Sequence, residues 1–280
     1  MNTSLTQEVP PRSPLAWLLS NGFLYSVITL LLSVIIVHSI FVLHVRPKAQ
    51  SIMTQQRAAM LANPAYVAER SMYVVIKDYE QEACITLMIW ALAILLHRAL
   101  EQREERRYLD SSLIDLPEGI QILPEDTRVY ARKIQSLSSA ERNRLAPRAL
   151  LAALARFGAT RNVQDVSSVA HSVCESEANR FESELSMLRY IAWAIPAIGF
   201  IGTVRGIGDA LSQAHKAVSG DISGVTEGLG VAFNSTLIAL LLSILLMFLL
   251  QALQRVQERL VQDTETYLDQ RIIRNMQAPR

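Results

Sequence analysis

The chain has 280 residues, of which 50% are hydrophobic and 19% are charged, and its formal net charge is +1. The mean hydropathy is +0.21, and the apolar residues fall in a few long blocks, as is typical of a membrane protein rather than a globular enzyme. The near-neutral charge gives no indication of nucleic-acid binding. The only two cysteines, Cys84 and Cys174, lie far apart, which argues against a disulfide framework or a metal site.

Residues 23–100 contain the first two predicted membrane spans, and residues 1–22 before them are expected to form a flexible tail. The block 23–45 is long enough to cross a bilayer. Because it has no Lys/Arg-rich start and no small-residue cleavage site, we interpret it as a retained helix rather than a signal peptide. A connector of mixed charge, 46–82, follows. Within it Asn63 and Pro64 predict a helix start that leads into the second span, at about 83–100.

Residues 101–188 read as a soluble helical region. Ser138 and Glu141 fit a capping box, and Gly158 predicts a helix end. Apolar residues at helical spacing predict an amphipathic helix over 165–188 that enters the third span without a stop signal. The same stripe continues beyond the fourth span, so residues 253–280 are expected to form a C-terminal helix.

These elements predict an all-α integral membrane protein with four transmembrane helices and long cytoplasmic helical extensions. Lys and Arg are abundant in 101–188 and in 253–280, whereas the connector between spans three and four holds only Lys216. We therefore expect a multi-pass membrane protein with both termini in the cytoplasm. The connector 46–82 opposes this charge rule, because four spans place its Lys and Arg residues outside.

The hairpin of spans three and four, residues 189–252, carries the most informative residues. Pro196 is expected to kink or loosen the third span, because proline removes one backbone hydrogen bond. Gly199, Gly202 and Gly206 recur at spacings of three and four, a small-residue pattern that lets helices approach closely. The simplest interpretation of these four residues is helix packing.

Hydroxyl and amide side chains are expected at one depth in both helices of this hairpin. Thr203 is about seven residues from the far end of its span, and Thr236 is about as far into its own, after Asn234 and Ser235. At about 1.5 Å rise per residue the two threonines should lie level. Polar groups in hydrocarbon usually face protein or water, so these four residues predict an ion pathway. Alone, a threonine can simply bond back to its own helix.

No Asp or Glu lies at the depth of the threonines in either hairpin helix. Arg205 and Asp209 are four residues apart, so we expect them to pair along one helix face near the interface, and secondarily to form a charged gate at the outer mouth. Glu227 should lie at the start of the fourth span. If a proton moves through this hairpin, its titrating carboxylate is therefore expected from another chain.

The segments PAIGFIGTVRGIGDAL and GLGVAFNSTLIAL resemble the MotA/TolQ/ExbB proton channel family over about Leu185–Leu260. The resemblance is carried by the proline and glycines named above, by Thr203, and by the run from Val231 to Thr236. It implies a homopentamer whose two hairpin helices line a pore around a dimer of a single-span partner with an intramembrane Asp. Ion flow would then drive rotation of the ring, with Thr203 and Thr236 in the ion pathway. Arg205 is a departure, because the family usually has an apolar or aromatic residue there.

Three readings of function follow from these patterns. The first is an ion-driven motor subunit, with the choice between H⁺ and Na⁺ left open, and with protein transport among the processes that such motors drive. The second is a non-conducting oligomeric scaffold that recruits a cytoplasmic partner. An enzyme is not expected, because the histidines are scattered and no HExxH, GxSxG or P-loop motif is present. No cofactor and no metal are expected.

Overall fold

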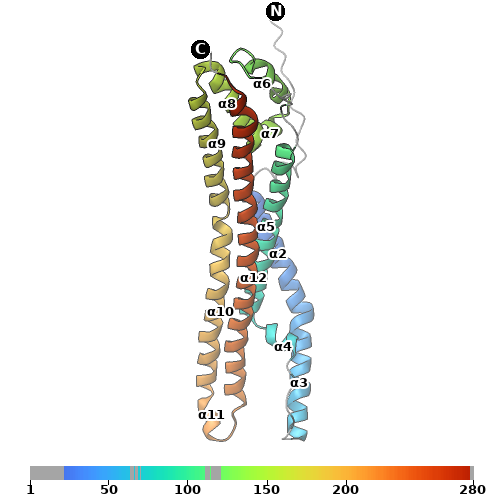
Figure 1. The fold of residues 1–280 in the computed structure, drawn as a ribbon. Coiled ribbons are helices and arrows are strands. Elements are labelled where there is room, and N and C mark those ends of the chain that lie inside the picture. The colour runs from blue at the N-terminus through green and yellow to red at the C-terminus, as the bar shows by residue number, and fades with distance from the viewer. Residues whose placement is uncertain are drawn as a thin grey trace, which may run out of the picture. The chain divides into compact units, whose positions relative to one another are not determined.

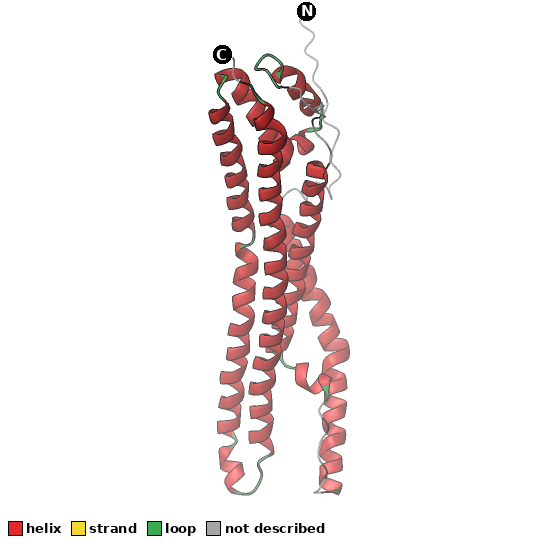
Figure 2. Ribbon diagram, viewed as in Figure 1, coloured by secondary structure: helices red, strands yellow, loops and turns green. Residues whose placement is uncertain are grey.

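The computed structural model describes residues 22–63, 66, 69, 71–110, 114 and 121–277. Their regular structure is helical, as Figure 2 shows, apart from one isolated bridge between Ile122 and Met276. Four helical segments are long and apolar enough to cross a membrane, so the predicted fold class is confirmed. These segments are Leu24–Met60, Tyr79–Leu109, Val163–Ser212 and Ser223–Asn275. Of the tail predicted for residues 1–22, residues 1–21 lie outside the described residues.

The chain divides into two compact units, and each is described by itself. The first comprises Met1–Ile94 and Ile191–Leu246, and the second comprises Leu95–Tyr190 and Met247–Arg280. Figure 1 labels the helices. Three of them, α5 (Tyr79–Asp110), α10 (Ser186–Ser212) and α12 (Ser223–Tyr267), contribute to both units.

The first span does not end at residue 45. Helix α2 (Gly22–Ile40) passes through a π-helical turn, η1 (Phe41–Val45), directly into α3 (Arg46–Ala62). The helix continues because Arg46–Ala62 is rich in Ala, Gln, Met and other good helix formers. The helix predicted to run from Asn63 into the second span is not continuous, because Ser71, Lys77 and Asp78 are not helical. Asn63 ends α3 in an extended conformation, φ −140° and ψ 103°, because the residue before a proline disfavours the helical region.

The helix that carries the second predicted span follows a separate short helix and continues beyond residue 100 into the region predicted to be soluble and helical. A short helix, α4 (Met72–Ile76), precedes α5, which runs for 32 residues from Tyr79 to Asp110. Pro64, the other residue of the predicted helix start, lies outside the described residues. The acidic residues Glu80 and Glu82 therefore occupy the first turn of a long helix rather than a connector. Carboxylates there interact favourably with the positive end of the helix dipole.

The second unit contains α6 (Thr127–Gln135), α7 (Ser139–Arg142), α8 (Leu145–Thr160), α9 (Val163–Glu184), η2 (Leu268–Ile272) and η3 (Ile273–Asn275). The capping box is confirmed, because Ser138 accepts a hydrogen bond from the Glu141 N–H and Glu141 accepts one from the Ser138 N–H. The predicted helix end at Gly158 is wrong. Helix α8 continues to Thr160, and Arg161 follows in the left-handed conformation, φ 55°. Gly158 instead serves packing, because a Cβ there would lie 2.8 Å from Thr127 Oγ1 of α6.

Helix α9 begins three residues after the end of α8, capped by the Asn162 side chain, which accepts from the Gln164 N–H at 2.9 Å. It is amphipathic, as predicted, and Glu177 lies inside its buried stripe. The Glu177 side chain is 2% exposed and pairs with Arg148 and Arg180, each at 2.6 Å. A single residue, Leu185, separates α9 from α10.

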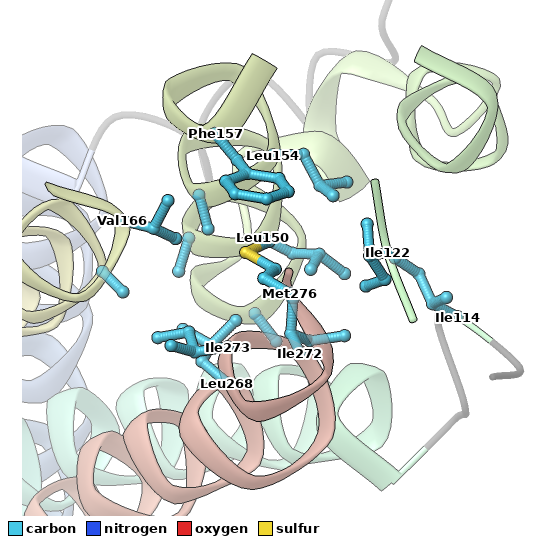
Figure 3. Close-up of a cluster of buried hydrophobic side chains, with 14 of the residues drawn as sticks. Ile114, Ile122, Leu150, Leu154, Phe157, Val166, Leu268, Ile272, Ile273 and Met276 are labelled. Carbon is cyan, nitrogen blue, oxygen red and sulfur yellow. The ribbon is translucent and has the colours of Figure 1, made fainter. Parts of the chain in front are cut away.

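Figure 3 shows the apolar core of the second unit, in which α8 meets the end of the chain. Leu150, Leu154 and Phe157 of α8 are fully buried together with Val166 of α9. From the end of the chain, the core includes Leu268, Ile272, Ile273 and Met276. Backbone bonds fasten that C-terminal segment, since the Ile122 N–H donates to Asn275 O at 2.7 Å and the Gln277 N–H donates to Ile122 O at 3.2 Å. The C-terminal stripe thus ends in a core contact rather than in solvent.

Removing the Leu154 side chain should destabilise this core. Leu154→Ala leaves a cavity where the side chain is fully buried, and we expect a loss of about 2–5 kcal/mol. Val129 lies on α6 and is 64% exposed, so Val129→Ala should change the free energy of unfolding by about 0.5 kcal/mol or less. Amide hydrogen exchange in α8 of the full-length chain measures the difference. Equal protection in the two variants would contradict the assigned core.

Candidate functional site

The helices α10 and α12 approach each other closely at several glycines. A Cβ on Gly206 would lie 2.5 Å from Ala232 N and 2.6 Å from Gly228 O. A Cβ on Gly228 would lie 2.6 Å from Ala210 N, and one on Gly199 would meet Ala239 Cβ at 2.5 Å. Real side chains do not fit at such distances, so the absence of side chains sets the spacing of the two helices. The structure thus places the predicted small-residue face against α12.

Pro196 leaves a carbonyl of α10 without its helical partner, and α12 supplies a donor. Proline has no N–H, so the Ala192 carbonyl, four residues earlier, lacks its usual hydrogen bond. The Ser243 hydroxyl of α12 donates to this carbonyl at 3.0 Å. Next to it, the buried Cys84 thiol of α5 donates to Ile195 O at 3.5 Å. The loosened turn is therefore held by side chains from two other helices.

Thr203 and Thr236 contact each other through their hydroxyl groups. Both hydroxyls also lie within hydrogen-bond distance of the Gly199 carbonyl, at 3.2 Å and 3.3 Å, and Thr203 lies 3.4 Å from Ala232 O. A hydroxyl donates one hydrogen and accepts others, so each can exchange a carbonyl partner for its neighbour. The equal depth predicted from sequence spacing corresponds to direct contact in the structure.

The other two polar residues of the run point in other directions. Ser235 is 1% exposed, donates to Val231 O of its own helix at 2.8 Å, and packs on Gly202, where a Cβ would lie 2.6 Å from Ser235 Oγ. Asn234 is half-buried, and its side chain makes no hydrogen bond with the residues that the structure describes. Successive helical residues point about 100° apart, so three consecutive polar residues cannot share one face.

Arg205 has a partner that the sequence interpretation missed. Its Nε and Nη2 donate to Glu80 Oε1 and Oε2 at 2.6 Å and 2.7 Å, whereas Asp209 Oδ2 lies 3.8 Å from Nη1. The predicted Arg205–Asp209 pair is therefore the weaker of two contacts. Bidentate arginine–carboxylate pairs are the stronger kind of ion pair. Glu80 comes from the first turn of α5, and the only sequence signal for it was the acidic flank of the second span.

The second carboxylate of that turn binds groups on the first span. Glu82 accepts from His38 Nδ1 at 2.7 Å and from Arg46 Nη2. The Arg46 guanidinium also lies over the Tyr79 ring, 4.3 Å from its centroid. Thus α5 is joined by charge to α10 on one side and to the α2–α3 helix on the other.

A charged cavity of about 460 Å³ lies beside the α10–α12 connector. Four cations and four anions line it, namely Arg57, Lys77, Arg205, Lys216, Asp78, Asp209, Asp221 and Glu227. Glu227 pairs with Arg57 at 2.9 Å. Hydrogen bonds from the Ser223 hydroxyl and then from its N–H lower the pKa of the Asp221 carboxyl. Balanced charge of this density suits water and small ions.

The hairpin and the helices that precede it were compared with known proteins. Residues 141–266 match the model of the MotA/TolQ/ExbB proton channel family. This segment is similar to the proton channel proteins of that family. The match confirms the resemblance and begins about 44 residues earlier than Leu185, so it includes α8 and α9. No curated protein matches the chain. Among the described residues, no group of three or more His, Cys, Asp or Glu side chains is arranged to hold a metal ion.

Two glycines of the hairpin form a matched test of its packing. Gly206→Ala would force the helices apart, and we expect a loss of about 1–3 kcal/mol. Gly208→Ala meets no atom within 4 Å and replaces a helical glycine, so it should leave stability unchanged or raise it by up to about 1 kcal/mol. Thermal unfolding of the detergent-solubilised chain measures both. A tolerated Gly206→Ala would show that the helices do not meet there.

Ser243→Ala should leave the Ala192 carbonyl without its hydrogen-bond donor. We expect a loss of about 0.5–2 kcal/mol, the range for hydrogen bonds between membrane helices. Pro196→Ala restores an N–H at the helical position, so adding it to Ser243→Ala should recover most of the loss. Thermal unfolding of the two single variants and the double variant tests the assignment. A double variant no more stable than Ser243→Ala would contradict it.

Proposed function

We propose that this chain is the pore-ring subunit of an ion-driven motor in the bacterial inner membrane. In this proposal five copies form the ring, both termini are cytoplasmic, and a dimer of a single-span partner occupies the centre. The partner's intramembrane Asp takes up the ion, for which the proton is the first candidate, and ion flow drives rotation of the ring around the partner. The contact between the Thr203 and Thr236 hydroxyls, inside a segment similar to a proton channel family, is the observation that carries the proposal.

The hydroxyl pair suits ion passage because its hydrogen bonds are exchangeable and it carries no charge. Neither α10 nor α12 places a carboxylate beside it, so an ion-binding group has to approach from elsewhere. Both helices also keep large apolar side chains exposed, including Phe200, Val204, Phe233 and Ile244. These faces need lipid or further chains to cover them, which supports assembly with other copies and with a partner helix.

The scaffold reading has one observation in its favour. Both hydroxyls lie within hydrogen-bond distance of the Gly199 carbonyl, so they also fasten α12 to α10. In that reading the hydroxyls would contribute to helix association alone. The two readings differ in what happens when the hydroxyls are removed without a change of shape.

Replacing Thr203 and Thr236 by Val tests this directly. Valine keeps the volume but cannot exchange protons, so we expect assembly to persist and ion flux to fall at least tenfold. Flux is measured as dye-reported H⁺ uptake, and separately as Na⁺ uptake, in membrane vesicles of cells that express the chain with its native partners. Assembly is measured by size-exclusion chromatography.

Thr226→Val is the control, because Thr226 lies on α12 but is exposed and bonds only to carbonyls of its own helix, at Ile222 and Ser223. It should leave flux unchanged. Normal flux in the Thr203→Val/Thr236→Val variant would exclude the ion pathway, and absence of flux from the unaltered protein with both ions would favour the scaffold.

A further inference from the structure

Arg205 places a permanent positive charge close to the hydroxyl pair. It lies two residues after Thr203 on α10, which is about 3 Å along the helix axis. The two side chains point about 200° apart around the helix, so the guanidinium acts on a cation at the hydroxyl pair through its charge rather than by contact. The Arg205 side chain is 41% exposed, so its repulsion of cations is weakened where water reaches it and is stronger where lipid or further chains cover it. A cation pathway at this position requires that the charge be balanced.

Glu80 provides the balance and does so with fixed geometry. Both of its oxygens accept from Arg205, at 2.6 Å and 2.7 Å, and the Glu80 residue is only 8% exposed. Gly202 provides the space, because a Cβ there would lie 3.1 Å from Glu80 Cγ. The bidentate contact also fixes the direction of the guanidinium, which points from α10 toward the start of α5.

We propose that Glu80 is a positioning residue for ion passage, which neutralises Arg205 and holds its guanidinium on α5 so that a cation can reach Thr203 and Thr236. The inference rests on the proposed function. It assigns to this chain a carboxylate that acts through Arg205 and does not itself carry the ion.

Asp209 is the natural comparison, because it also faces Arg205. Its carboxylate lies 3.8 Å from Nη1 and its side chain is 61% exposed, so solvent screens it. Asp78 and Lys77 lie in the same cavity and pair with each other at 3.0 Å, so the Lys77 ammonium offsets part of the attraction of Asp78 for Arg205. Glu80 is thus the buried, direct partner, and Asp209 is a screened neighbour of the same chemistry.

The test compares four forms of the full-length chain in the vesicle flux assay with its native partners. Glu80→Gln leaves the guanidinium unbalanced, and we expect H⁺ or Na⁺ flux to fall at least tenfold. Asp209→Asn should change flux by less than about twofold. Glu80→Gln/Arg205→Gln removes both charges, and flux should return to within about threefold of the unaltered protein.

The double variant separates charge balance from a structural role. If the pair served only to hold α5 on α10, removing both members would leave flux as low as in Glu80→Gln, and that result would overturn the inference. Unaltered flux in Glu80→Gln would overturn it as well. Absence of flux from the unaltered protein, or normal flux after Thr203→Val/Thr236→Val, would instead refute the proposed function, and this use of Glu80 with it.

Infrared spectroscopy gives a second readout that needs no ion flux. A charged Glu80 shows no protonated-carboxyl band, so the unaltered protein and Asp209→Asn should have the same carboxyl region at neutral pH. Arg205→Gln should add one band that disappears in Glu80→Gln/Arg205→Gln. A Glu80 band already present in the unaltered protein, identified by its loss in Glu80→Gln, would show that the ion pair does not exist.

Discussion

The first turn of α5 carries the interaction on which the membrane part of this protein depends. Two carboxylates in this turn, separated by one residue, each bind an arginine from a different helix. Glu80 binds Arg205 of α10, and Glu82 binds Arg46 at the start of α3. Inside a bilayer an unpaired charge is costly, so each pair constrains both of its helices. A helix N-terminus favours carboxylates as well, which makes this turn a suitable place for both.

The second constraint is that backbone carbonyls need hydrogen-bond donors, and it explains most of the small polar residues in the hairpin. In hydrocarbon every carbonyl needs a donor. Ser243 supplies one for Ala192, Cys84 adds a weak one at Ile195, and the two threonines approach Gly199. The two threonine hydroxyls that approach Gly199 are also the groups of the proposed ion pathway, which is why the scaffold and the motor readings share this part of their support.

Sequence patterns gave the helical class, the four spans, the capping box and the level of the two threonines, because each depends on local periodicity or on residue spacing along one hairpin. They did not give the partner of Arg205. The i to i+4 rule identified Asp209, but Glu80 lies 125 positions away and only the packing of α5 on α10 brings it near. The error at Gly158 has the same origin. A glycine can end a helix or allow close packing, and the contact of Gly158 with Thr127 decides which use applies.

The hydrogen bond from Ser243 to Ala192 has a mechanical consequence. In an ordinary helix this carbonyl would be tied to the next turn, and bending would break a bond within that helix. Here the bond that resists bending at Pro196 belongs to another helix. Helix α10 therefore cannot flex at its proline without pulling on α12, and the two arms of the hairpin have to move as a linked pair rather than as independent rods.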